Sequence, residues 1–351
     1  MPRLSCTIVG VAAAAAALLS VACVVVEPPA DGAADGPPVS VRDDGDGGWE
    51  SGPARVAGGL ESGVIGDTAE AGDALAPEAA VSPVDPPVDP PVDPPPPVPT
   101  FGCGASTTSV GFLGSQRIDV AGTGRTYELY VPAGYDSTRA YPIVFAFHGD
   151  GGTGAGLRSS FHLEAASSGQ AFIVYPDGTG KTWHNDTLPT LTPDIAFIDA
   201  IVDSLVVSHC VDSAHIFATG MSRGAYFANQ LVCRSRTAFR AVASHSGGGP
   251  FGIDSSDWDG QGHLKCNATL SALQVHGLAD YVVPLSEGKK PRDFWRGQNG
   301  CAATTSASGT SPCIAYDGCA RPEVWCAIPG LGHQLWSNAP QVTWDFFASA
   351  P

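Results

Sequence analysis

The segment GMSRG at residues 220–224 lies between a stretch with the pattern of a β-strand, 215–219, and one with the pattern of a helix, 223–233. Glycine on both sides of a serine predicts a sharp turn, because a side chain at either flanking position would collide with the adjoining strand or helix. Such a turn lifts the serine hydroxyl out of the sheet. The segment therefore predicts a strand–turn–helix unit that exposes Ser222 at the carboxyl end of a strand.

The sequence around this turn alternates short apolar runs with helical stretches, which predicts an α/β fold. A helix is predicted at 193–207, because Thr192 suits an N-cap and Pro193 the first helical position. Continuous apolar runs indicate strands buried on both faces, as parallel strands are. We expect a mostly parallel sheet with helices on both faces. Further strands are predicted at 127–131, 143–147, 172–175, 241–244, 273–276 and 324–328.

An exposed serine acts as a nucleophile only with a base, and the base needs an orienting acid. Asp280 lies in the loop after the strand 273–276, and His333 lies in a glycine-rich loop after the strand 324–328. The order serine, acid, histidine is the one that serine hydrolases with an α/β sheet use. Ser222, Asp280 and His333 are therefore predicted as the catalytic residues, while His276 is predicted to be structural because it belongs to the strand.

The loop after the strand 143–147 contains HGDGG at 148–152. A glycine-rich loop lets backbone N–H groups approach the substrate closely, so an oxyanion hole is predicted from the N–H groups of Asp150 and Arg223. The same loop also matches G-x-G-x-x-G at 149–154, and Asp177 ends the next strand, as in a dinucleotide-binding fold. That alternative leaves the three catalytic candidates unexplained, and we expect no cofactor.

Charge is distributed unevenly along the 351 residues, whose net charge is −17. Residues 24–100 hold fifteen acidic residues, two arginines and sixteen of the 30 prolines. Such a composition offers little apolar surface to bury, so 23–100 is predicted to be a disordered acidic Pro-rich linker, with a Pro-Val-Asp repeat that favours a stiff spacer over a polyproline ligand. Residues 101–351 are predicted to form one folded domain. The acidic balance argues against nucleic acid as a partner.

The N-terminus has the pattern of an export signal over residues 1–22, with Arg3 before the apolar run 8–19. Either a lipobox or an ordinary signal-peptidase site would be cut before Cys23. Eight cysteines beyond residue 100 can pair completely, which leaves Cys23 as an odd thiol and a predicted lipidation site. We therefore expect a disulfide-containing protein that is secreted or is a bacterial cell-surface lipoprotein anchored to the membrane. No C-x-x-C or H-E-x-x-H motif occurs, so no metal site is predicted.

Several motifs together resemble one family: GCG at 102–104, RTY at 125–127, YVP at 130–132, FHG at 147–149, CVD at 210–212, FATGMS at 217–222, HG at 276–277 and GH at 332–333. They look like the secreted feruloyl esterase, acetylxylan esterase and poly(3-hydroxybutyrate) depolymerase group within the α/β-hydrolases, which is carbohydrate esterase family one. The resemblance covers nearly all of 101–350. It implies a serine esterase that cleaves plant-wall acyl esters, or related polyesters, with the triad named above.

The resemblance leaves the substrate contacts open. Arg223 follows the nucleophile where relatives often have a small or aromatic residue, and Trp336 lies farther from His333 than is usual. Trp183 and Trp336 are predicted as substrate-binding residues that flank an aromatic acyl group or a sugar, although core packing would explain each equally well.

Cys210 and Cys233 bracket the nucleophile strand and helix and are predicted to pair. The other pairings stay open. We expect a monomer whose partner is a polysaccharide-linked or polyester acyl substrate. The alternative from a different class is a surface glycan-binding protein that has kept the hydrolase fold without turnover.

Overall fold

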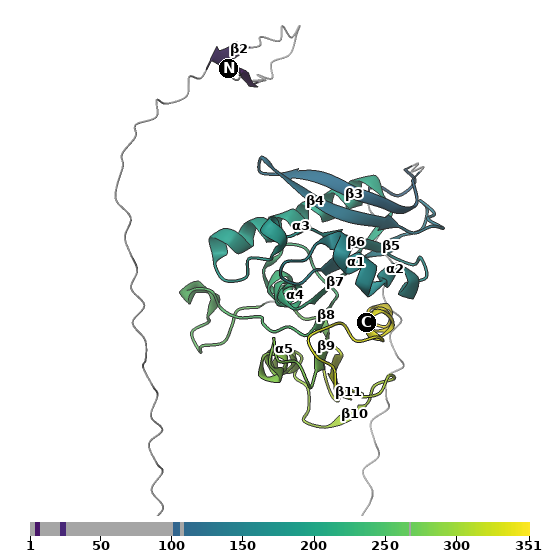
Figure 1. Cartoon of the computed structure of the whole chain (residues 1–351), viewed down its shortest axis with the longest axis vertical. Helices are drawn as coiled ribbons and strands as arrows, with labels where there is room; N and C mark the ends of the chain where they lie inside the picture. Colours follow the sequence, from purple (N-terminus) through teal and green to yellow (C-terminus); the bar gives the residue numbers. More distant parts are fainter. Residues whose placement is uncertain (1–3, 8–21, 26–100, 106–108, 267) are drawn as a thin grey trace, which may run out of the picture. The chain divides into compact units, whose positions relative to one another are not determined.

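The computed structural model describes residues 4–7, 22–25, 101–105, 109–266 and 268–351 (Figure 1). The chain divides into two units, Met1–Val84 and Asp85–Pro351. In the first unit, β1 (Leu4–Thr7) and β2 (Ala22–Val25) form an antiparallel pair. The predicted signal peptide and linker lie mostly outside the described residues, so both stay predictions.

The second unit is built on a ten-stranded sheet. Its six central strands run parallel to one another, and antiparallel strands complete both edges. The predicted mostly parallel sheet is therefore confirmed. In spatial order the strands are β10 (Thr305–Ala307), β11 (Cys313–Tyr316), β12 (Glu323–Ile328), β9 (Ser271–Gly277), β8 (Ala241–His245), β7 (Val211–Met221), β5 (Tyr141–Phe147), β6 (Phe172–Pro176), β4 (Thr123–Val131) and β3 (Gly111–Val120).

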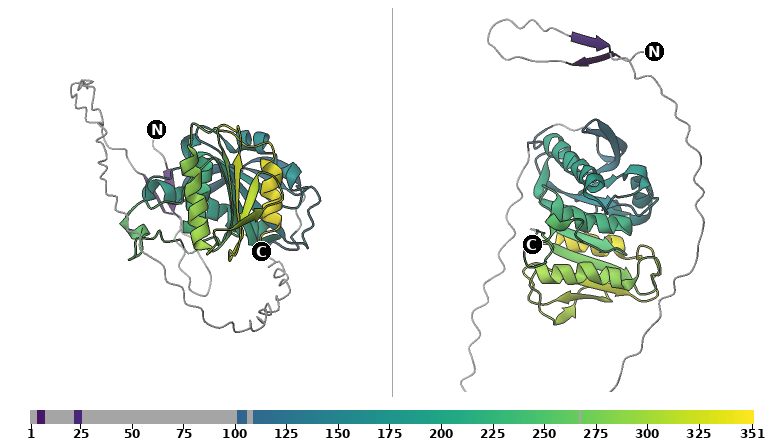
Figure 2. Two further views of the ribbon diagram at one scale, coloured as in Figure 1. Left: turned by 90° about the horizontal axis from the view of Figure 1, so that it is seen from below. Right: turned by 90° about the vertical axis from the view of Figure 1, so that its left-hand side faces the viewer.

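Helices cover both faces of this sheet, as predicted, and each face has its own apolar core. One core receives side chains from α3 (Leu188–Ser208), α4 (Arg223–Arg234) and α5 (Leu285–Gln298). The other receives side chains from α1 (Gly154–Phe161), α2 (Leu163–Ala166) and α6 (Ala339–Ala348). Figure 2 shows α5 and α6 on opposite sides of the sheet. Short 3₁₀ turns lie at Thr179–Lys181 and Ser255–Asp257.

Each predicted strand is present, but the predicted start of helix 193–207 is wrong. Helix α3 begins at Leu188, five residues earlier, with Thr187 at the N-cap position and a proline in the first turn. Pro193 then lies inside the helix. Because Pro193 is the sixth residue of the helix, its missing N–H removes one hydrogen bond within the helix, to the carbonyl four residues earlier. Two prolines four residues apart both suit a helix start, and local sequence does not distinguish them.

The eight cysteines of the second unit form four disulfides, Cys103–Cys210, Cys233–Cys266, Cys301–Cys319 and Cys313–Cys326. Complete pairing is as predicted, but the predicted Cys210–Cys233 bridge is wrong. The segment 101–105 lies close to the end of α3, where the N–H of Gly102 donates to the carbonyl of Val206 at 3.0 Å. Cys210 therefore meets Cys103, a residue 107 positions away in sequence.

The disulfides differ in the length of chain that they close, which generates a stability prediction. Removing Cys103–Cys210 by double substitution to alanine should lower the free energy of unfolding more than removing Cys313–Cys326 in the same way. The loops span 107 and 13 residues. Loop-closure entropy then predicts a difference of about 2 kcal/mol between the two double variants. Denaturant unfolding measures both, and equal losses would contradict the expectation.

Candidate functional site

Ser222 occupies the turn between β7 and α4. Its backbone has φ 56° and ψ −125°, a strained conformation that costs on the order of 1–3 kcal/mol in an L-residue. The N–H of Ser222 donates to the carbonyl of His245 in β8 at 2.9 Å. This hydrogen bond to strand β8 fixes the turn. The predicted strand–turn–helix geometry is present.

Glycines at this turn allow backbone segments to touch. A Cβ atom at Gly220 would lie 2.4 Å from backbone atoms of Gly224, and one at Gly224 would lie 2.1 Å from the carbonyl oxygen of Phe147. A Cβ atom at Gly149 would lie 3.3 Å from Cβ of Ser222. The steric requirement for glycine therefore comes both from the turn itself and from the neighbouring strand β5.

His333 lies between Ser222 and Asp280. Its Nε2 is 2.8 Å from Oγ of Ser222, and its Nδ1 is 2.8 Å from Oδ2 of Asp280. The carboxylate accepts from the Nδ1–H, which leaves Nε2 to accept the Ser222 hydroxyl proton. The three residues predicted as a triad therefore lie in one chain of hydrogen bonds, although 111 positions separate Ser222 from His333.

The carboxylate of Asp280 is fully buried and well supplied with donors. Burial by itself raises the pKa of Asp280, but hydrogen bonds from His333 and from the N–H groups of Val283 and Val282 lower the pKa below its ordinary value. The two N–H groups lie 2.9 and 3.0 Å from Oδ1. Asp280 is consequently an anion that faces His333 with its other oxygen.

His276 is structural, as predicted from its position in β9. Its side chain is buried, and its Nε2 lies 2.9 Å from the carbonyl oxygen of Val283. That contact ties the loop that carries Asp280 to the strand before it. The same Nε2 is 3.8 Å from Oδ2 of Asp280, longer than a hydrogen bond.

The loop after β5 is held by His148. Its Nε2 accepts the N–H of Gly178 at 2.9 Å, so its Nδ1 carries the proton and donates to the carbonyl of Gly149 at 2.7 Å. Burial lowers the pKa of His148 and keeps the ring neutral. The Gly149 carbonyl faces His148 and also accepts from Gly152 at 3.1 Å. In a trans peptide the following N–H, that of Asp150, points the opposite way.

The predicted oxyanion donors therefore flank Ser222. Gly149 lies against Ser222 and precedes Asp150, while Arg223 begins helix α4, where the first N–H groups have no partner within the helix. Among the described residues, neither N–H has a recorded acceptor. The Asp150 side chain is exposed to solvent, so its carboxylate can stay in water.

The Arg223 side chain points toward the loop at 183–186. Its Nε donates to the carbonyl of Trp183 at 2.8 Å, and its guanidinium pairs with Asp186 at 2.5 Å. The Nδ2 of Asn185 donates in turn to the carbonyl of Arg223 at 3.2 Å. The unusual residue after the serine thus forms one wall of the site and leaves its own N–H unobstructed.

Two cavities adjoin the Ser222–His333 pair. One, of about 280 Å³, is lined by Ser222, Arg223, Asn185 and the apolar side chains of Tyr226, Phe251 and Val283. The other, of about 500 Å³, is lined by His333, the loop at 148–153, part of α1, and Met221 and Leu335. Asp150 lines both. The site therefore has separate space on the serine side and on the histidine side.

The prediction that Trp183 contacts the substrate is wrong. Its side chain is 0% exposed, stacks on Phe227 with ring centroids 4.4 Å apart, and donates its indole N–H to the carbonyl of His148 at 3.0 Å. Trp183 therefore positions the loop after β5 from inside the core. Trp336 is half-buried against the other core and is not among the residues that line either cavity.

Sequence reasoning missed Tyr226, Phe251 and Asn185. Tyr226 lies in the first turn of the predicted helix that follows Ser222, so its position near the serine could have been found. Its phenol donates to Glu287 at 3.1 Å, and burial together with that carboxylate raises its pKa. Phe251 and Asn185 carry no local signal, because they reach the site from long loops.

The dinucleotide alternative finds no support at Asp177. Its carboxylate accepts the N–H of Gly154 at 2.8 Å and the hydroxyl of Thr126 at 2.8 Å, so it ties the start of α1 to the sheet. In the described residues no group of three or more His, Cys, Asp or Glu side chains could hold a metal ion. None of the helices in that part of the chain combines the length and the apolar character that a membrane span requires.

Comparisons with known proteins give a consistent result. A family model described as Phospholipase/Carboxylesterase matches residues 190–318. Feruloyl esterase C of Emericella nidulans is 34% identical over 266 residues, which cover 71% of this chain and 91% of that protein. The probable feruloyl esterase C of Aspergillus terreus is 32% identical over 268 residues, with the same two coverages of 71% and 91%.

A solved structure agrees in fold. The acetyl xylan esterase from Aspergillus awamori matches with a TM-score of 0.51 and 19% identity, covering 66% of this chain and 99% of that chain. At this level of identity the likeness concerns the fold alone. It confirms the predicted α/β class.

The glycine contacts around Ser222 generate a prediction with a matched control. Gly224→Ala should lower the unfolding midpoint, because its Cβ would fall 2.1 Å from the backbone oxygen of Phe147, which cannot move without shifting β5. Gly297→Ala, in helix α5 with nothing within 4 Å, should be neutral or stabilising by up to about 1 kcal/mol. Thermal unfolding checks both. Equal midpoints for the two variants would refute the steric account.

Proposed function

We propose that this chain, which belongs to the feruloyl esterase C family of α/β-hydrolases and is a carboxylic ester hydrolase, cleaves feruloyl-type esters of plant cell-wall polysaccharides. In this proposal Ser222, His333 and Asp280 form the catalytic triad. The observation that carries the proposal is the hydrogen-bond chain, in which His333 lies 2.8 Å from both Ser222 and Asp280. As the chain is an enzyme, the alternative of a non-catalytic glycan-binding protein is set aside.

The reaction follows from this geometry. Ser222 Oγ attacks the ester carbonyl while His333 Nε2 takes its proton, and the anion of Asp280 stabilises the imidazolium that forms. The N–H groups of Arg223 and Asp150 stabilise the negative oxygen of the tetrahedral intermediate. His333 returns the proton to the leaving alcohol, which departs and leaves the acyl group on Ser222. Water, activated by His333, then releases the acid and restores the serine.

The reaction indicates which part of the ester each of the two cavities binds. The acyl group stays bonded to Ser222, so it occupies the cavity of about 280 Å³ that Ser222 lines. Tyr226 and Phe251, whose rings lie 6.4 Å apart, supply an apolar wall that suits an aromatic acyl group. The alcohol receives its proton from His333, so the sugar side occupies the cavity of about 500 Å³ that His333 lines.

Export of the protein is supported by its four disulfides, which form in oxidising compartments. The relatives named above are fungal, whereas the pattern around Cys23 predicted a bacterial surface protein. Lipid attachment at Cys23, membrane anchoring, and the monomeric state stay predictions. The relatives' names concern feruloyl esters, and the polyester alternative has no support from them.

Loss of the nucleophile tests the triad. Ser222→Ala should abolish hydrolysis of methyl ferulate and covalent labelling by a fluorophosphonate, because no oxygen remains to be acylated. Asp280→Asn should lower kcat by about 10⁴-fold, because the wrong histidine tautomer is favoured. Ser115→Ala, at an exposed position of β3, is the control and should keep full activity. Turnover by Ser222→Ala at the level of that control would rule out the assigned nucleophile.

Acyl selectivity tests the assignment of the cavities. Phe251→Ala should lower kcat/KM for methyl ferulate by at least about tenfold and affect a small acetate ester much less, because only the aromatic acyl group loses its apolar contact. Leu335→Ala, in the other cavity, should leave the ferulate-to-acetate ratio unchanged. The reverse pattern would mean that the acyl and alcohol sides are exchanged. Faster cleavage of a 3-hydroxybutyrate oligomer than of either ester would favour the polyester alternative.

A further inference from the structure

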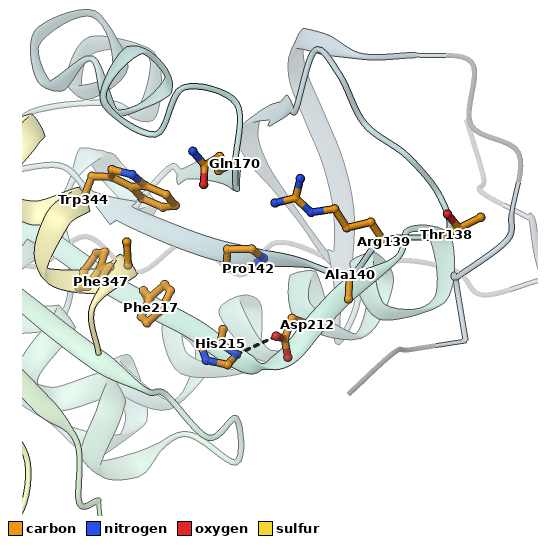
Figure 3. Close-up of a pocket in the computed structure, with 11 residues that line it drawn as sticks. Thr138, Arg139, Ala140, Pro142, Gln170, Asp212, His215, Phe217, Trp344 and Phe347 are labelled. Carbon is orange, nitrogen blue, oxygen red and sulfur yellow. Dashed lines mark hydrogen bonds and ion pairs between the residues drawn. The ribbon is translucent and has the colours of Figure 1, made fainter. Parts of the chain in front are cut away.

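A cavity of about 600 Å³ between β5, β7 and α6 offers little to a ligand (Figure 3). Its aromatic walls are core side chains, because Phe217, Phe347 and Trp344 are 2%, 1% and 9% exposed. Its carboxylate, that of Asp212, is buried and pairs with His215 at 2.7 Å. The cavity of about 280 Å³ assigned above to the acyl group differs, because a phenol oxygen in its wall can still accept a hydrogen bond.

This phenol is that of Tyr226, which lines the acyl cavity together with Phe251 and Val283. Its O–H donates to Oε2 of Glu287, in the first turn of α5, at 3.1 Å. The other oxygen of that carboxylate pairs with Lys290 at 2.5 Å, which holds the carboxylate in place. Burial and the charge of Glu287 raise the pKa of Tyr226, so the phenol keeps its proton. The phenol oxygen can therefore accept a hydrogen bond from a ligand, but its proton is already donated to Glu287.

The other polar groups of the acyl cavity leave this oxygen as the acceptor at its apolar end. Nδ2 of Asn185 and the guanidinium of Arg223 bond oxygens of the protein itself, and Oδ1 of Asn185 is buried out of reach of solvent. Asp150 and Asp186 are exposed, so a ligand hydroxyl that bonds either carboxylate only replaces water. Tyr226 is half-buried beside apolar side chains that exclude water. The cavity therefore suits a neutral acyl group with a hydroxyl donor at its apolar end.

An aromatic acyl group with a hydroxyl para to its chain meets this requirement. Its ester carbonyl and its hydroxyl lie at opposite ends of a flat group, so the hydroxyl points away from Ser222 when the carbonyl lies beside it. The phenol oxygen of Tyr226 contacts α5, whereas the proposed oxyanion donors of Asp150 and Arg223 adjoin Ser222. A methoxy group in place of the hydroxyl has no proton to donate, and its oxygen would face the phenol oxygen without a hydrogen bond.

We propose that Tyr226 determines acyl specificity by accepting a hydrogen bond from the para-hydroxyl of an aromatic acyl group, with Glu287 as the positioning residue that holds the phenol proton. The proposal rests on the proposed function, because it takes the cavity beside Ser222 as the acyl site. The hydrogen bond is present in the bound ester and in the transition state alike. Its loss should therefore raise KM for a phenolic ester and leave kcat unchanged.

Binding to the full chain without turnover tests the proposal. In the Ser222→Ala protein, methyl ferulate should bind at least about fivefold more tightly than methyl 3,4-dimethoxycinnamate, in which a methoxy group replaces the hydroxyl. Adding Tyr226→Phe should raise the Kd for methyl ferulate by at least about fivefold and leave the Kd for the dimethoxy ester unchanged. Adding Glu287→Gln should raise the Kd for methyl ferulate less, because the amide oxygen still accepts the phenol proton but carries no charge. NMR titration measures each Kd.

The matched control is Tyr316→Phe, which removes a phenol hydroxyl from β11, outside both cavities at the catalytic site. It should leave both Kd values unchanged. Equal Kd values for the two esters in Ser222→Ala would overturn the proposal, and so would a loss of affinity from Tyr226→Phe that is the same for both, because the phenol would then only pack. Hydrolysis of methyl ferulate by the unaltered enzyme is measured separately. Its absence would contradict the proposed function, while the Kd values would still decide the role of Tyr226.

Discussion

Contact between backbone segments without intervening side chains is the constraint on which the site depends. Gly224 packs on the carbonyl of Phe147, and Gly149 packs on Ser222. Through these contacts strand β5, the turn after β7 and the start of α4 approach one another closely. The strained φ of 56° at Ser222 persists because this packing and the bond to His245 hold it. A side chain at either glycine would separate the nucleophile from the loop that is proposed to stabilise its oxyanion.

The remaining groups reach Ser222 because the sheet is parallel at its centre. The carboxyl ends of the parallel strands β5, β7, β9 and β12 lie at the same end of the sheet. The loops that follow these strands therefore bring together Asp150, Ser222, Asp280 and His333. Each loop is then held by local hydrogen bonds, from His148 in one case and from Val282 and Val283 in another.

Sequence reasoning succeeded where the signal was local. The elbow around Ser222, the loops of Asp280 and His333, and the strands could be predicted because each depends on a short run of residues with a distinct steric or apolar pattern. It failed for the Cys210 bridge, the start of α3 and Trp183. For the bridge and for Trp183 the outcome depended on a distant segment, the chain at Gly102 and the ring of Phe227. For α3 the signal was local but ambiguous, because two prolines four residues apart both suit a helix start.

The sequence by itself therefore determined the fold class, the uneven division of charge along the chain, and the residue types and order of the candidate triad. Only the tertiary structure decided which cysteines meet, that Trp183 belongs to the core, and that two cavities flank Ser222 and His333. The physical reason is that turns and strands are specified by neighbouring residues, whereas cavities and bridges are formed by side chains whose separation along the chain carries no periodic pattern. Phe251 and Asn185 line a cavity beside Ser222 solely because of where their loops pack.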